Sequence, residues 1–303
     1  MFVVSHYNED LTWLFELVEA NDDESDSGFR AWSATVYMKQ AEAAIALERD
    51  VADRGLVLDA NAPGLVHISV VREPENWGDE AVPYLRFITT HYEALPPLIA
   101  FVHGSPREHS PFLSHMIECM QPQYDGYFSI GNPFLTNNGP TASHLFDPLA
   151  THFNGKLAAL GLADLGPAAT SNVSYYGAAQ FIVSRAAVRR RPLAYWKALL
   201  ATALEVRQWK VENLYGERAG KISAYWLEFG WHEHFTKRHG EEWRSYEETC
   251  GANDSTTVPL LRACCEDVRH IELLTMLKSD IVQRVVGGRV WLRHRAHPPK
   301  GNE

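Results

Sequence analysis

The chain contains little cysteine, no long apolar run and no excess of basic residues. Its four cysteines follow no zinc-binding spacing, which favours reduced thiols in an intracellular protein. No apolar stretch approaches the roughly 20 residues of a membrane span, and polar residues occur too early for a secretory signal. With 28 basic and 38 acidic residues the net charge is −10, which argues against a general nucleic-acid binder. We therefore expect a soluble cytoplasmic protein without a transmembrane segment or a nucleic-acid partner.

Three common catalytic signatures are also missing from the sequence. There is no Gly-x-Ser-x-Gly nucleophile elbow, no P-loop and no Gly-x-Gly-x-x-Gly dinucleotide loop. Readings as a serine hydrolase with such an elbow, a P-loop ATPase or a classical dehydrogenase are therefore disfavoured.

Strand-like and helix-like segments alternate along the first 100 residues. Strands are predicted at residues 2–4, 34–38, 65–71 and 98–102, with helical patterns at 11–19 and 40–52 and around Tyr84. This order predicts an α/β fold with a mostly parallel sheet flanked by helices. Later segments predict strands at 127–130 and 172–185 and helices at 145–160, after Pro192 and at 224–235. We expect a catalytic domain at residues 1–238 and a mainly helical extension at 239–303, with a late strand at 290–292.

The polar turn after the first strand is the first candidate site. Tyr7, Asn8, Glu9 and Asp10 follow the apolar run directly, where ligands bind beyond the carboxyl ends of parallel strands. Asp10 also stands at the N-cap position of the following helix. A capped turn without a ligand is therefore the alternative interpretation.

The turn and several later segments carry a resemblance. The opening Val3–Glu9 resembles the first strand and Tyr-Asn-Glu turn of GT-A glycosyltransferases, which are nucleotide-diphospho-sugar transferases. The chain also resembles an uncharacterised domain-of-unknown-function family associated with that superfamily. The matching positions are Tyr7–Asp10 with Trp13; Asn76, Gly78, Glu80, Ala81, Tyr84 and Leu85; Phe101, Gly104 and His109; Gly177, Ala178, Gln180, Phe181, Val183, Ser184 and Arg185; and Glu228 with Trp231 and Phe235. The chain departs from the family at Asp79, where Arg is usual, and at His103, where Gln is usual, which leaves the donor specificity open.

The resemblance implies a GT-A-like fold and transfer of a sugar from a UDP- or GDP-sugar to a glycan or another hydroxyl acceptor. Tyr7, Asn8, Glu9 and Asp10 would line the nucleotide pocket. Glu80 and His103 would lie on the donor or metal side, and Glu228 on its aromatic helix would be the general base. The aromatic helix and the loops of 131–172 would shape the acceptor groove.

Such enzymes often hold Mn²⁺ or Mg²⁺ on an Asp-x-Asp turn, and no such turn follows an apolar strand here. Either His103 and an acidic partner hold the metal, or arginines around Arg185 stabilise the diphosphate without one. The Arg cluster can equally be a solvated helix start. Glu80 can be a helix cap, and Glu228 can pair with an arginine for structural reasons.

Two other functions remain open at this point. His103 and His109 flank one loop, which suits a metal-assisted hydrolase of phosphate or sugar esters. A nucleotide- or carbohydrate-binding module without catalytic activity would also lack the Asp-x-Asp turn. The sequence does not specify the stereochemical outcome or the oligomeric state.

Overall fold

The protein was examined as a computed structural model of residues 1–303. The structure describes residues 1–19, 33–56, 67–73, 79–110, 113, 126–130, 135–137, 143–167, 174–176, 179–206, 222–235, 282–286 and 289–293. Within these ranges no helix combines the length and the apolar character that crossing a bilayer requires.

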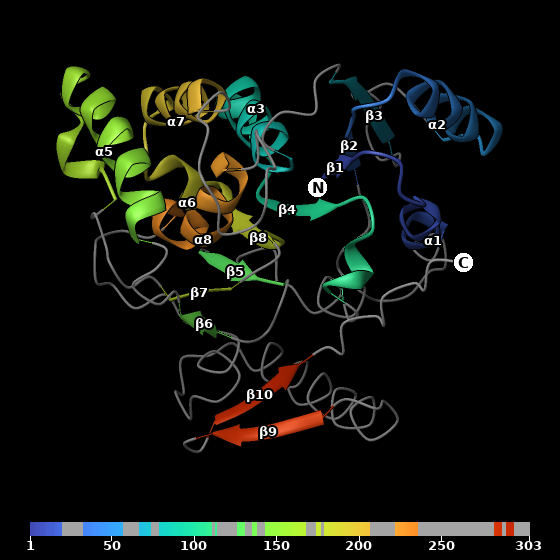
Figure 1. Cartoon of the computed structure of the whole chain (residues 1–303). Coiled ribbons are helices and arrows are strands. Elements are labelled where there is room, and N and C mark those ends of the chain that lie inside the picture. The colour runs from blue at the N-terminus through green and yellow to red at the C-terminus, as the bar shows by residue number, and fades with distance from the viewer. Residues whose placement is uncertain are drawn as a thin grey trace, which may run out of the picture.

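A six-stranded mixed sheet forms the centre of the fold (Figure 1). Its strands, in spatial order, are β3 (His67–Arg72), β2 (Ser33–Met38), β1 (Phe2–His6), β4 (Leu98–His103), β8 (Phe181–Ser184) and β5 (Tyr127–Ser129). The first four are parallel, and β8 runs antiparallel to both β4 and β5. Five strands therefore share one direction, which confirms the predicted α/β fold with a mostly parallel sheet.

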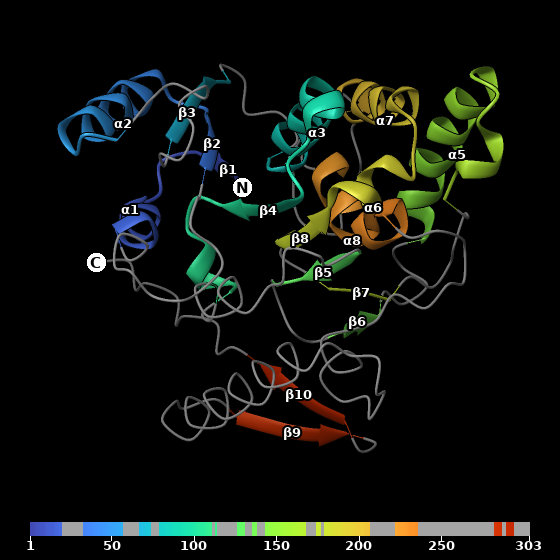
Figure 2. The same ribbon diagram turned by 180° about the vertical axis from the view of Figure 1, so that it is seen from behind.

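Helices cover both faces of the sheet, and β1 shows how its residues divide between them. Phe2 and Val4 pack into the core under α1 (Thr12–Glu19) and α2 (Ala41–Asp53). Val3, between them, points to the core formed with α3 (Ala81–His91), α5 (Ser143–Ala159), α7 (Leu193–Glu205) and α8 (Ile222–Phe235). Figures 1 and 2 show these two groups of helices on opposite sides of β1 and β4. Burial on both faces explains why the parallel strands are almost continuously apolar.

Helix starts follow the capping residues that the sequence predicts. The Asp10 carboxylate accepts hydrogen bonds from the Thr12 backbone N–H at 2.9 Å and the Thr12 hydroxyl at 2.6 Å, at the start of α1. The Ser184 hydroxyl accepts from the Ala187 N–H at 2.9 Å and begins α6 (Arg185–Arg189). The cap predicted at Asp10 is confirmed, and Ser184, the last residue of β8, caps α6 in the same way.

The segment 172–185 differs from its prediction as one strand. It forms β7 (Ser174–Tyr176), which pairs with β6 (Leu135–Asn137), and then β8, which joins the main sheet. Ala179 lies between them with φ 44°, a left-handed conformation that interrupts an extended chain. Short 3₁₀ helices complete the described part at η1 (Tyr92–Ala94), η2 (Pro106–Glu108) and η3 (Ala163–Leu165).

Near the end of the chain, β9 (Val282–Val286) and β10 (Arg289–Arg293) form an antiparallel hairpin. This confirms the strand predicted at 290–292. The helices predicted elsewhere in 239–303, and with them the proposed domain boundary, lie outside the described residues.

Candidate functional site

The strand order reverses beside β1. The chain passes from β1 outward to β2 and β3, and then crosses back to place β4 on the other side of β1. In open α/β sheets such a switch point opens a crevice beyond the carboxyl ends of the two strands, where ligands bind. The Tyr7–Asp10 turn follows β1 at this edge, and Gly104 follows β4.

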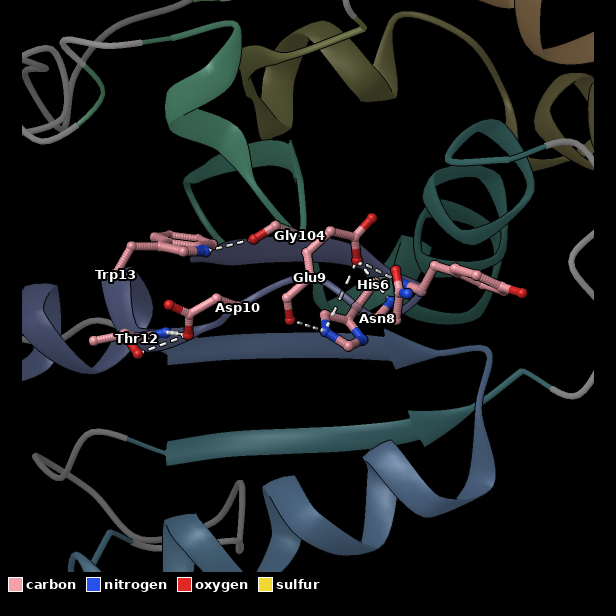
Figure 3. Close-up of polar contacts among 8 residues, drawn as sticks. His6, Asn8, Glu9, Asp10, Thr12, Trp13 and Gly104 are labelled. Carbon is pink, nitrogen blue, oxygen red and sulfur yellow. Dashed lines mark hydrogen bonds and ion pairs between the residues drawn. The ribbon is translucent and has the colours of Figure 1, made fainter. Parts of the chain in front are cut away.

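Within the turn after β1, the Glu9 side chain folds back onto its own backbone (Figure 3). Its Oε2 accepts hydrogen bonds from the N–H groups of Tyr7 at 2.7 Å and Asn8 at 3.1 Å. The Glu9 carbonyl oxygen lies 2.7 Å from Nε2 of the buried His6 ring. These contacts hold the turn in one shape and leave the Tyr7 side chain 43% exposed at the edge.

The turns after β1 and β4 are joined to each other. The Trp13 indole N–H of α1 donates to the Gly104 carbonyl oxygen at 2.6 Å in a buried hydrogen bond (Figure 3). Gln180, at the start of β8, accepts from the His103 N–H at 3.3 Å and donates to the Pro106 carbonyl oxygen at 3.1 Å. Two segments distant in sequence, α1 and the residue before β8, therefore fix the chain that leaves β4.

Two carboxyl groups approach one another beside this edge. Glu80 begins α3, and Glu228 lies in the middle of α8, which packs against α3. Burial and, to a smaller extent, the nearby carboxylates of Glu228 and Asp79 together raise the pKa of Glu80 to about 8. At neutral pH Glu80 therefore mostly keeps its proton. Glu80 makes no side-chain capping hydrogen bond to α3, so the structure does not support its interpretation as a helix cap.

His103, the last residue of β4, is the third group of the cluster. Its Nε2 lies 4.0 Å from Oε2 of Glu80, too far for a hydrogen bond. Burial lowers the pKa of His103 to about 3, and the charges of His109 and Lys39 act in the same direction. The His109 ring is 5.7 Å from the His103 ring. His103 and Glu80 are thus both neutral at pH 7 and form no ion pair.

Lys39 supplies the positive charge of the cluster. It follows β2 directly, and its Nζ donates to the Asp79 carbonyl oxygen at 2.9 Å. Asp79 has φ 44°, a left-handed conformation that Asp adopts more readily than most residues. The Lys39 ammonium group lowers the pKa values of both Glu80 and His103, so it faces the same space as these two side chains.

Of the predicted site residues, the structure brings Glu80, His103 and Glu228 together and places Glu9 in the adjoining turn. Tyr7 and Asn8 are exposed at the edge, while the Asp10 carboxylate is used as the cap of α1. Its hydrogen bonds with Thr12 lower the pKa of Asp10.

Arg185 lies elsewhere. Because β8 is antiparallel to β4, Arg185 follows the end of β8 at the opposite edge, where its N–H donates to the Pro97 carbonyl oxygen at 2.9 Å. In the same cluster, Arg189 donates to the carbonyl oxygens of Tyr92 and Glu93, and Arg190 to that of Phe235. This placement separates the arginines from Glu80 by the length of β4 and ties Arg189 and Arg190 to the ends of other helices.

The aromatic helix α8 was predicted to contribute to an acceptor groove, and this is wrong for Trp231 and Phe235. Trp231 and Phe235 are fully buried, and their rings pack on Phe181 at centroid distances of 5.4 Å. α8 contacts α3 and α7 as well as the strand β7, so apolar side chains on several of its sides enter the core. Of the segment 131–172, the structure describes residues 135–137 and 143–167, which contain β6, α5 and η3, and residues 131–134, 138–142 and 168–172 lie outside the described part.

The described residues contain no group of three His, Cys, Asp or Glu side chains arranged to hold a metal ion. His103 and Glu80 are the pair predicted for that role, and a third ligand does not accompany them in this part of the chain. The Lys39 ammonium group is itself positively charged, so it would repel a metal ion bound beside it.

Sequence reasoning missed Lys39, Asp79 and the role of Gln180. Lys39 is the first residue after a predicted strand, so the rule that selected Tyr7 could have selected it. The position of Gln180 follows from the antiparallel direction of β8, which nothing in the local pattern of residues shows.

The fold and its edge define an α/β protein with a candidate ligand site at the β1–β4 switch point. Residues 2–121 match the model of a family described as "Protein of unknown function (DUF3431)". The matched segment contains Glu9, Glu80, His103 and Lys39, whereas Glu228 lies beyond it. No curated protein matches the chain.

Proposed function

We propose that this protein is a glycosyltransferase that transfers a sugar from a UDP- or GDP-sugar to a hydroxyl group of an acceptor such as a glycan. The observation that carries the proposal is the position of Glu80, 4.0 Å from His103 at the end of β4 and near enough to Glu228 on the neighbouring α8 for the two carboxyl groups to influence each other. Two carboxyl groups with different protonation at one pH can divide acid and base roles between them. The GT-A resemblance of the opening strand and turn is consistent with this location.

Glu228 acts as the general base in this proposal. Glu80, whose pKa is raised to about 8, holds a proton at neutral pH, and Glu228 is the group assigned to accept the proton of an acceptor hydroxyl. The hydroxyl oxygen then attacks the anomeric carbon, and the bond from that carbon to the nucleotide diphosphate breaks. The proton ends on Glu228, and the diphosphate leaves as an anion.

The donor side is formed by the Tyr7–Asp10 turn and by Lys39. Tyr7 is exposed at the edge and offers an aromatic face to a base or a sugar ring. Lys39 lies between the ends of β2 and the start of α3, and its ammonium group can stabilise a phosphate oxygen of the leaving group. It takes the role that the sequence had suggested for Arg185, which lies at the opposite edge.

No metal step is part of the proposal, because no three His, Cys, Asp or Glu side chains among the described residues are arranged to hold a metal ion. The metal-assisted hydrolase is less well supported for the same reason.

The decisive experiment is a panel of nucleotides and nucleotide sugars, each with and without Mn²⁺, monitored by thermal stabilisation and by release of the nucleotide diphosphate. Stabilisation with turnover is expected for one donor. Glu228→Gln should reduce kcat by at least 100-fold while the donor still stabilises the protein. Glu48→Gln is the matched control, because Glu48 pairs with Arg72 on the surface and takes no part in the cluster.

Stabilisation without turnover, unchanged in Glu228→Gln, would indicate a binding module. Phosphatase or esterase activity that is lost in His103→Ala would indicate the hydrolase. If no nucleotide or nucleotide sugar stabilises the protein, the glycosyltransferase proposal fails.

A further inference from the structure

Two buried polar groups between α3 and α8 have no hydrogen-bond partner among the described residues. They are the Tyr84 hydroxyl and the Trp231 indole N–H, and both side chains are fully buried. An unsatisfied donor in a protein core costs about 1–3 kcal/mol, so native structures usually satisfy such groups with protein or with ordered water. Two other buried indoles of the described core have acceptors: Trp13 donates to Gly104 and Trp196 to Val188.

Both groups lie on the same faces as the carboxyl pair. Tyr84 follows Glu80 by four residues on α3, and Trp231 follows Glu228 by three on α8, so each pair shares one side of its helix. The Tyr84 and Trp231 rings are 6.1 Å apart between centroids. Burial and, second to it, Glu80 raise the pKa of the Tyr84 hydroxyl, which indicates that this hydroxyl lies near the Glu80 carboxyl group.

We propose that ordered water occupies the space between α3 and α8, accepts hydrogen bonds from Tyr84 and Trp231, and donates to the Glu80 carboxyl group. A buried water needs two to four polar partners, and these three groups supply them. The carboxyl pair alone would not require a bound water; the two unpartnered donors do.

The water links the apolar core to the candidate base. Its hydrogen bond fixes the orientation of the Glu80 carboxyl group, whose proton is then directed at the Glu228 carboxylate. Tyr84 is in this sense a positioning residue for Glu228. This last step rests on the proposed function, whereas the presence of the water does not.

The direction in which one substitution changes Tm tests directly whether the water is present. Tyr84→Phe removes only the hydroxyl. If the hydroxyl is bonded to water, Tm should fall by roughly 2–4 °C, the shift expected for a lost hydrogen bond of about 1 kcal/mol. If the hydroxyl is unsatisfied, removing it should leave Tm unchanged or raise it. Tyr92→Phe is the reference, because the Tyr92 hydroxyl donates to the Arg191 carbonyl oxygen at 2.7 Å and its loss should lower Tm.

Nuclear magnetic resonance gives a second measurement on the wild-type protein. The Trp231 indole proton should show a cross-peak to water, and the Trp13 and Trp196 indole protons, which have protein acceptors, should not. A crystal structure should show density for the water beside Tyr84. Absence of both signals, or a Tm that does not fall in Tyr84→Phe, would overturn the inference.

The positioning role has its own measurement. The groups that act on Glu80 are Glu228 on α8, Asp79 before α3, Lys39 after β2, and His103 at the end of β4. A water that donates to Glu80 stabilises its charged form, so Tyr84→Phe should raise the ionisation midpoint of Glu80 in a ¹³C-carboxyl titration. An unchanged midpoint would remove the positioning role, and neither result depends on finding a sugar donor.

Discussion

The carboxyl group of Glu9 occupies the space that a side chain at position 104 would need. A Cβ atom added to Gly104 would lie 2.8 Å from the carboxyl carbon of Glu9 and 3.0 Å from its Cβ. Both distances are shorter than ordinary van der Waals contact, so a larger residue at position 104 would displace the Glu9 side chain from its hydrogen bonds with the N–H groups of Tyr7 and Asn8. The same Gly104 accepts the hydrogen bond from Trp13, which holds the two turns at this separation.

Gly104→Ala should therefore destabilise the protein by about 1–3 kcal/mol, the usual cost of overpacking. Denaturant unfolding measures the change. Gly155→Ala is the matched control, because Gly155 lies inside α5 with no atom within 4 Å of the added Cβ. Alanine there should stabilise the helix by about 0.5–1 kcal/mol. Equal effects of the two substitutions would contradict the close fit of Glu9 and Gly104.

Glu80→Gln should stabilise the protein at neutral and alkaline pH. The pKa of Glu80 is raised from 4.5 to about 8, so the folded state holds a proton that the unfolded state releases. The stability this gives is full below pH 4.5 and is lost as the pH rises toward 8, at about 1.4 kcal/mol per pH unit at most. Glutamine cannot ionise, so unfolding free energies of the variant measured from pH 4.5 to 8 should lack this decline. The prediction is wrong if the unfolding free energies of the wild type and the variant fall in parallel between pH 4.5 and 8.

His103→Gln should change the pH dependence of stability at acid pH. The pKa of His103 is lowered from 6.5 to about 3, so the folded state keeps the ring neutral while the unfolded state takes up a proton. This stability is full above pH 6.5 and is lost as the pH falls toward 3. Acid unfolding of His103→Gln should therefore lack the wild-type loss of stability that begins near pH 6.5. His152→Gln is the control, because His152 is exposed and pairs with Glu205 on the surface. An equal effect of both variants would contradict the buried, neutral His103.

Much of the fold could be predicted from local patterns. The apolar run at Phe2–Val4, the cap at Asp10 and the helical spacing of Tyr84, Leu85 and Ile88 each describe one element, and the structure confirms each. The parallel order of the first four strands follows from the alternation of strands and helices.

The candidate site was less predictable, because it depends on directions and distances between elements. The proximity of Glu80, His103 and Glu228 was proposed from the resemblance, but the antiparallel course of β8, which moves Arg185 to the other edge, leaves no mark in the sequence around it. Likewise, aromatic residues on α8 look alike whether they stack on a sugar or fill a core. Only the packing of α8 against α3 and α7 shows that Trp231 and Phe235 are buried.

Lys39 and Arg185 lie at opposite edges of the sheet, so we expect their substitutions to affect nucleotide binding differently. Lys39→Met should weaken binding of UDP or GDP by about tenfold, the effect of losing one charge-assisted hydrogen bond to phosphate. Arg185→Met should leave the affinity unchanged. Isothermal titration calorimetry with the nucleotide that stabilises the protein measures both, and Lys39→Arg should retain most of the affinity because it keeps the charge. If Arg185→Met weakens binding and Lys39→Met does not, the nucleotide binds away from the β1–β4 edge. The cluster of Glu80, His103 and Glu228 would then need a different substrate.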